Sequence, residues 1–293
     1  MRYFDRIHPA AAFVYFAAVI ILAMLTLSPV ICCICFVMSV ALYGLMAGVR
    51  KALCGLLWIV PFILIISATN SLFVSKGATV LFFINSRAIT LEATLYGLFS
   101  AVMISSVMFL CMCFSEIMTS DKFIYLFGGV FPRLALILSM AIGFIPRMKQ
   151  RYREISEAQR AMGIYSSDSL TDKIRARLRA ISALLTCSLE DSVDTAMSMR
   201  ARGYGTVRPS PYSSYVFRAS DAVVTAISII CFVLCVVLNM QGAGEAVFYP
   251  YARLLPTDAP SCALYALYAI LFGASVFAEV KEDILWHYLK LKI

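Results

Sequence analysis

Long apolar runs recur along the chain, and several of them approach or exceed the roughly 20 residues that a helix needs to cross a bilayer core of about 30 Å. Six such runs lie at about 10–27, 29–47, 52–75, 93–115, 222–240 and 262–279. The third run contains Pro61, which a membrane helix tolerates when neighbouring helices surround it. This pattern predicts an all-α, polytopic membrane protein with about six transmembrane helices.

The first apolar run does not have the features of a cleaved signal peptide. No small-residue cleavage site and soluble domain follow it, and a second apolar run begins at once. We therefore expect it to be the first membrane helix. A further run at 134–145, LALILSMAIGFI, has only twelve residues, which suits an interfacial or buried helix better than a span.

A long polar segment separates the fourth run from the fifth. Twelve basic residues between positions 147 and 208 outnumber seven acidic ones, so this part carries a net charge of +5. It is too polar to span a membrane. We expect three parts: an N-terminal membrane domain at 1–115, a cytoplasmic domain of two or three long helices at 116–219, and a C-terminal membrane domain at 220–293.

Within the polar segment, apolar residues recur at steps of three and four, which is typical of one helical stripe. The stripe comprises Ile174, Leu178, Ile181, Leu185, Leu189 and Val193, and it continues at Ala196 and Met197. We predict a helix from Thr171 to Arg202, about 45 Å long, with Thr171 as N-cap and Asp172 in the first turn. A preceding helix is expected to end near Met162, with Pro146 as its start or as a kink, Gly163 as its stop and a polar linker after it.

The end of the longer helix carries an unusual cluster of residues, MSMRARGYGTVRPSPY at 197–212. Gly203 is placed to end the helix in the left-handed conformation, and Gly205, Pro209 and Pro211 prevent a restart. Arg200 and Arg202 are expected in the last turn. Two interpretations stay open: the arginines are capping charges or anchors for anionic lipid, or they insert into a groove of another protein and bind a carboxylate.

Lysine and arginine are distributed unequally between the two sides that six spans create. All 25 except Lys76, Arg87 and Arg253 fall on the side of the two ends and of the 116–219 segment. Because positive residues accumulate on the cytoplasmic side, both ends and this segment are predicted to be cytoplasmic in a multi-pass cell-membrane protein.

Residues for catalysis or metal binding do not form a recognisable pattern. The chain has no G-x-x-x-x-G-K-[ST] loop for ATP, and its two histidines, His8 and His287, are far apart. All ten cysteines except Cys187 lie in or beside predicted spans, where cysteine acts as a small hydrophobe. We therefore expect no catalytic residue, no metal site and no cofactor in this chain, and no nucleic-acid partner.

Two motifs about forty residues apart resemble a known family. AQRAMG at 158–163 and Ala201-Arg202-Gly203, together with FIPRM at 144–148 and SLEDSVDTAMSMRARGYG at 188–205, are similar to the transmembrane T component (EcfT/CbiQ-like) of energy-coupling factor (ECF) transporters. The resemblance covers about 140–220. These ABC-type systems take up vitamins, cofactors or transition-metal ions.

The resemblance implies that two Ala-Arg-Gly motifs end two coupling helices, and that each docks into one of two ATP-binding cassette ATPase subunits, which bind ATP and Mg. The second motif is intact here, with Arg200 before it. The first reads Ala161-Met162-Gly163, so methionine replaces the arginine. Two alternatives stay open: Arg160, two residues earlier, supplies the charge, or the first site docks by apolar packing alone. A small membrane substrate-binding S component would contact the stripe from Ile174 to Val193, unless that stripe packs against the chain's own first coupling helix.

Two other classes compete with this energy-coupling scaffold. A self-contained permease, in which substrate crosses through this chain, is expected to show discontinuous helices or buried charges. The ionisable residues near membrane edges, Glu92, Asp221 and Glu279, are explained more simply by helix-end positions. A membrane enzyme requires a general base beside its polar groups, and the sequence does not offer one.

Overall fold

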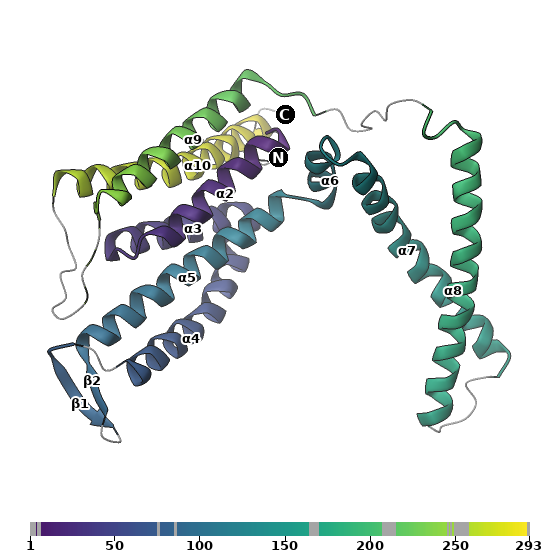
Figure 1. The fold of residues 1–293 in the computed structure, drawn as a ribbon, viewed down its shortest axis with the longest axis horizontal. Coiled ribbons are helices and arrows are strands. Elements are labelled where there is room, and N and C mark those ends of the chain that lie inside the picture. The colour runs from purple at the N-terminus through teal and green to yellow at the C-terminus, as the bar shows by residue number, and fades with distance from the viewer. Residues whose placement is uncertain are drawn as a thin grey trace. The chain divides into compact units, whose positions relative to one another are not determined.

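The computed structural model describes residues 4, 7–74, 77–84, 87–163, 170–206, 215–244, 246, 248 and 258–291. Within these residues the chain forms nine helices and one two-stranded hairpin (Figure 1). The elements are α2 (Pro9–Leu25), α3 (Pro29–Ala47), α4 (Val49–Phe73), β1 (Val80–Ile84), β2 (Arg87–Thr90), α5 (Leu91–Ile117), α6 (Ser120–Gly128), α7 (Pro132–Ala161), α8 (Leu170–Ala201), α9 (Ala219–Met240) and α10 (Ala259–Leu291). The predicted all-α, polytopic membrane fold is confirmed.

Five of the described helices are long and apolar enough to cross a membrane: α3, α4, α5, α9 and the Ala259–Leu285 part of α10. The sixth expected span corresponds to α2, which is apolar but has only 17 residues. It ends at Leu25, earlier than predicted, because Thr26 is already extended (φ −124°, ψ 118°). Pro61 lies inside α4, as the sequence indicated.

The chain divides into two compact units. One, which we call the membrane unit, comprises Met1–Thr119 and Tyr215–Ile293. The other, which we call the inserted unit, comprises Ser120–Ser214 and contains α6, α7 and α8.

The core of the membrane unit lies where α3 and α4 pack on α5, α2 on α9, and α3 on α10. Its largest buried side chains include Tyr268, Phe16 and Phe109. Buried hydroxyls are hydrogen-bonded, as an apolar surrounding requires: Tyr268 donates to the Leu22 carbonyl at 3.0 Å, and its oxygen lies 3.1 Å from the Thr26 hydroxyl.

The hairpin between α4 and α5 was not predicted from the sequence. Strands β1 and β2 are antiparallel, and the loop before them contacts the start of α5. The backbone N–H of Thr79 donates to the Glu92 carboxylate, 3.2 Å from Oε1. A Cβ atom at Gly77, where φ is 138°, would lie 2.5 Å from Glu92 Oε2, so another residue there would be strained and would displace this carboxylate. For Glu92 and Asp221 the helix-end explanation agrees with this geometry, since Asp221 likewise accepts from the Arg218 backbone N–H at 3.0 Å. It is wrong for Glu279, which is buried inside α10, twelve residues before that helix ends.

In the inserted unit, two helices are long: α7 has 30 residues and α8 has 32. Helix α7 begins at Pro132, so of the two alternatives for Pro146 the helix start is wrong, and this proline lies inside the helix. The apolar run at 134–145 forms the first half of α7. Helix α8 already includes Leu170, so Thr171 is a helical residue and not its N-cap, whereas Asp172 lies in the first turn as expected. The predicted linker after Gly163 lies outside the described residues.

Candidate partner-docking site

The two long helices of the inserted unit end in the same backbone conformation. Ala161 is the last residue of α7, Met162 is the C-cap and Gly163 follows with φ 76°. Ala201 is the last residue of α8, Arg202 follows it, and Gly203 has φ 78°. The helix ends therefore read Arg-Ala-Met-Gly and Arg-Ala-Arg-Gly, and they differ only at the third residue. We call them the first and second tips.

Backbone hydrogen bonds explain why each helix stops at its glycine. The N–H of Gly163 donates to the Arg160 carbonyl at 3.0 Å, and that of Gly203 donates to the Arg200 carbonyl at 2.9 Å. At the second tip, the N–H of Tyr204 also donates to the Met199 carbonyl at 3.0 Å. These last two bonds form a Schellman motif, which requires a left-handed residue and so favours glycine.

Both tips are accessible on the surface of the described chain. Arg160, Ala161, Met162 and Gly163 are exposed at the first, and Met162 keeps 70% of its surface. At the second tip Arg200, Ala201 and Arg202 are exposed and Gly203 is half-buried. Arg200 lies in the last helical turn as predicted, whereas Arg202 lies just after the last helical residue. Pro209 and Pro211, expected to block a restart, lie outside the described residues.

Helix α8 packs with its small residues and exposes its large ones. Its buried residues are Ala176, Ala180 and Ser188. By contrast, the six residues of the predicted stripe keep between 44% and 69% of their surface exposed (Ile174, Leu178, Ile181, Leu185, Leu189 and Val193). The stripe is therefore not used for packing against α7, and it forms a continuous apolar face that the described chain leaves uncovered.

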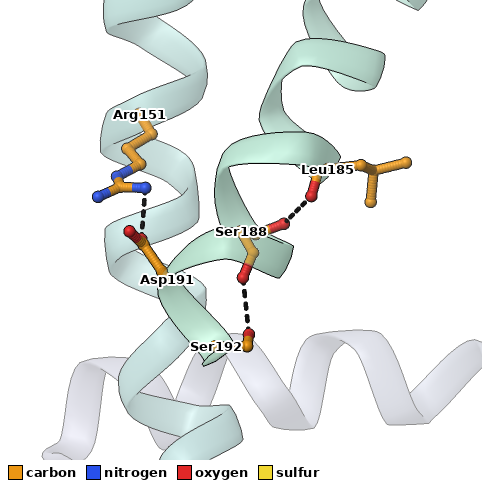
Figure 2. A network of polar contacts seen from close by, with 5 residues as sticks. All are labelled: Arg151, Leu185, Ser188, Asp191 and Ser192. Carbon is orange, nitrogen blue, oxygen red and sulfur yellow. Dashed lines mark hydrogen bonds and ion pairs between the residues drawn. The ribbon is translucent and has the colours of Figure 1, made fainter. Parts of the chain in front are cut away.

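An ion pair joins α7 and α8 near their crossing (Figure 2). Arg151 of α7 meets Asp191 of α8, and both side chains are about 40% exposed. Beside it, the Ser188 hydroxyl donates to the Leu185 carbonyl at 2.9 Å and the Ser192 hydroxyl donates to the Ser188 carbonyl at 2.6 Å. Both hydroxyls bond within their own helix, so neither requires a hydrogen-bond partner on α7.

A groove of about 880 Å³ extends from this crossing between the two helices. Helix α7 contributes Met140, Phe144, Arg147, Met148 and Arg151 among others, and α8 contributes Asp191, Asp194, Thr195 and Met199. The structure thus brings together the FIPRM segment and the SLEDSVDTAMSM segment, which are far apart in sequence. The groove itself was not predicted, because a helical period does not show where two helices diverge.

The described residues do not form a cluster suited to a metal ion. No group of three or more His, Cys, Asp or Glu side chains among them is arranged to hold a metal ion. His8 accepts a hydrogen bond from the Ala10 backbone N–H at 3.2 Å and so caps α2, while the side chain of His287 lies outside the described part.

Comparison with known proteins identifies the family. The sequence pattern of the cobalt transport protein family, CbiQ, matches residues 4–213, which is well over half of the chain. This chain belongs to the CbiQ family. The predicted resemblance is confirmed, and the match includes both tips and the groove between α7 and α8.

Three curated relatives are named energy-coupling factor transporter transmembrane protein EcfT. The protein from Staphylococcus aureus is 28% identical over 193 residues, which cover 59% of this chain and 70% of the relative. Those from Bacillus selenitireducens and Listeria innocua are 34% and 35% identical over 96 and 72 residues, or 32% and 24% of this chain. These two matches span only 36% and 27% of the relatives' own length.

Membership of the CbiQ family settles the general class of this chain. It is a multi-pass membrane protein of the family that supplies the transmembrane component of ECF transporters. Transmembrane components of this family are non-catalytic transporter subunits that carry no cofactor, which confirms the prediction that the chain is not an enzyme.

Proposed function

We propose that this CbiQ-family chain is the energy-coupling scaffold of an ECF-type ABC importer. It transmits the ATP-driven motion of two cytoplasmic ATPase subunits to a separate substrate-binding membrane subunit, for uptake of a vitamin, cofactor or metal ion. One observation carries the proposal: α7 and α8 end in two exposed tips of matching backbone geometry. A single chain with two equivalent tips fits a pair of related ATPases.

The second tip is built to bind a carboxylate in a groove. Its Schellman motif ends α8 abruptly, and the small side chain of Ala201 allows a partner to approach the backbone closely. Arg202 lies at this blunt end with its planar guanidinium, whose forked donors form bidentate bonds with carboxylates. Such a charge-assisted pair gives both orientation and affinity to the docking.

The first tip has different chemistry on the same backbone. Met162 takes the place of Arg202, and methionine is an unbranched, adaptable side chain that packs well in irregular apolar pockets. Arg160 is common to both tips, since it matches Arg200. We propose that the first tip docks mainly by apolar packing, and that this difference lets two non-identical ATPases each recognise their own tip.

The crossing of α7 and α8 connects the tips to the rest of the inserted unit. Helices α7 and α8 pack against each other and are joined by the Arg151–Asp191 ion pair, so we expect a displacement of one tip to move both helices. The exposed stripe from Ile174 to Val193 is the proposed contact with the substrate-binding subunit. Its continuous apolar surface is the property that such a contact requires.

The proposed membrane orientation places the inserted unit and both ends of the chain in the cytoplasm. Its support is the excess of lysine and arginine on that side. ATPase subunits and their ATP are cytoplasmic, so this placement and the docking role of the tips depend on each other.

Reversal of the charge at the second tip tests the docking role. In a tagged chain co-expressed with its transporter subunits, Arg202→Glu is expected to reduce co-purified ATPase at least tenfold, because truncating a buried interfacial charge pair costs about 2–5 kcal/mol. Arg153→Glu, which reverses an exposed charge on α7 away from both tips, is the matched control and is expected to retain the ATPases. Full ATPase recovery and transport with Arg202→Glu contradicts the proposal.

The difference between the tips is tested by making them alike. Met162→Arg gives both tips the sequence Arg-Ala-Arg-Gly, and we expect the two ATPases to be recovered in altered proportion because the apolar contact is replaced by a charge. Met162→Leu keeps the apolar character and is expected to leave the proportion unchanged. Unaltered ATPase pairing and transport in Met162→Arg removes the support for discrimination by the first tip.

A further inference from the structure

Charge is distributed unevenly along α8. Residues 170–181 contain Lys173, Arg175, Arg177 and Arg179 against Asp172, a net charge of +3. Residues 182–197 contain three acidic residues and no lysine or arginine. Positive charge is therefore concentrated in the first third of the helix.

This position is unfavourable for the helix itself. The N-terminal end of a helix carries a partial positive charge, so cations in its first turns are repelled by it. The ion pair between Arg175 and Asp172, at 3.8 Å, offsets this repulsion only in part, because the Arg175 side chain is 73% exposed. The helix dipole therefore does not explain why Arg175, Arg177 and Arg179 gather here, and their exposed side chains point to an external anionic partner.

The cations flank the exposed apolar stripe on both sides. At 100° per residue, Arg175 and Arg177 lie about 80° to either side of the line through Ile174, Leu178 and Ile181. The side chains of these five residues are exposed, as is that of Arg179, while Lys173 is half-buried. An apolar ridge between two rows of long cationic side chains is typical of helices that lie along a membrane surface, since the aliphatic stems pack beside the ridge and the charged groups reach the phosphates.

We propose that Lys173, Arg175, Arg177 and Arg179 bind the phosphate headgroups of anionic phospholipids and hold the first third of α8 against the membrane surface. Lipid then shares the stripe with the substrate-binding subunit, whose contact continues at Leu185, Leu189 and Val193. The membrane unit of the same chain keeps these headgroups close, which raises their effective concentration. The proposal rests on the proposed cytoplasmic placement of the inserted unit, where anionic lipids attract basic segments. It does not rest on docking of ATPases.

The test uses the full chain, without other subunits, in nanodiscs of phosphatidylcholine alone or of equal parts phosphatidylcholine and phosphatidylglycerol. Hydrogen–deuterium exchange of residues 170–181 is expected to be at least about fivefold slower with phosphatidylglycerol, since one surface cation contributes about that factor. Raising the salt to about 0.5 M is expected to remove the difference by screening. Exchange in α5 serves as the internal measure of an intact membrane unit.

Two variants identify the groups responsible. Replacing all four residues by glutamine (Lys173→Gln, Arg175→Gln, Arg177→Gln and Arg179→Gln) is expected to abolish the lipid-dependent protection. Replacing the three arginines by lysine keeps the charge and is expected to keep the protection. Equal exchange in both lipid compositions overturns the proposal, as does lipid-dependent protection that persists in the glutamine variant. Protection that appears only when other transporter subunits are added indicates an acidic protein surface instead, and also overturns it.

This experiment is independent of the docking test. Arg202→Glu is expected to keep the lipid-dependent protection, because position 202 lies at the opposite end of α8. A negative lipid result together with intact ATPase docking rejects only the headgroup site. Loss of docking together with intact protection rejects only the role of the second tip.

Discussion

At the residue scale, Gly163 and Gly203 determine where the two long helices stop. Both adopt positive φ, at 76° and 78°. An L-residue with a Cβ atom is strained there by roughly 1–2 kcal/mol. The backbone conformation alone therefore explains why each tip contains a glycine, whether or not the tip contacts a partner.

Gly203→Ala is expected to loosen the end of α8 and to destabilise it by about 1 kcal/mol. The Schellman bonds of Gly203 and Tyr204 are the ones affected, so their amides should exchange with deuterium faster. Gly143→Ala is the matched control: this glycine lies inside α7, and the space that an added Cβ atom would occupy is open to 4 Å, so the substitution should stabilise α7 by about 0.5–1 kcal/mol. Unchanged amide exchange in Gly203→Ala contradicts the strain argument.

Single residues were predictable where local backbone chemistry decides the outcome. The glycine stops, Asp172 in the first turn and the helix-end position of Asp221 follow from capping rules. Thr171 failed as an N-cap because Leu170 is already helical, and a sequence with several polar residues before a helix does not specify which one begins it.

At the element scale, α8 has two apolar faces with different roles. Ala176, Ala180 and Ser188 are buried, whereas the larger Leu185 and Leu189 are exposed. The 3.6-residue period correctly predicted the helix. It did not predict which face packs within the chain, because small residues that permit close helix approach contribute little to a hydrophobic period.

Substitutions on the two faces are expected to have opposite consequences. Leu189→Ser removes an exposed side chain, so the free energy of unfolding of the inserted unit should change by no more than about 0.5 kcal/mol, while recovery of the substrate-binding subunit falls. Ala180→Leu adds volume at a buried position and should destabilise the helix pair by about 1–3 kcal/mol. Thermal unfolding and co-purification measure the two effects, and destabilisation by Leu189→Ser contradicts the assignment of faces.

The hairpin shows the limit of sequence interpretation for short elements. Its strands have five and four residues and lie between two long apolar helices, so their alternation is difficult to distinguish from a continuing apolar run. The contact of Glu92 with Thr79 that fixes the loop connects residues 13 positions apart, and periodicity contains no information about it.

At the scale of the whole molecule, the charge asymmetry gives a direct expectation for orientation. In a cysteine-free background, Thr206→Cys beside the second tip is expected to react with a membrane-impermeant maleimide only from the cytoplasmic side. Val80→Cys in the hairpin is expected to react only from the other side, and both positions are exposed. Labelling of both positions from one side contradicts the predicted orientation.

The division into a membrane unit and an inserted unit is the basis of the proposed coupling. Apolar run length gave the spans closely except at α2 and α10. An early extended residue shortens α2, and α10 continues twelve residues beyond the predicted end at 279. The groove and the exposed stripe depend on how α7 crosses α8, which is a tertiary property. These surfaces became visible only in the structure.

Site-specific photo-crosslinking from position 202 tests the central claim most directly. In a second experiment the crosslinker replaces Arg200, which lies at the same helix end. Comparing the two positions shows whether the ATPase contacts this helix end in general or position 202 in particular. In membranes containing the complete transporter, we predict an adduct between position 202 and an ATP-binding cassette subunit that forms less readily from position 200. Adducts to phospholipid alone, or an inserted unit that faces away from the cytoplasm, contradict the account.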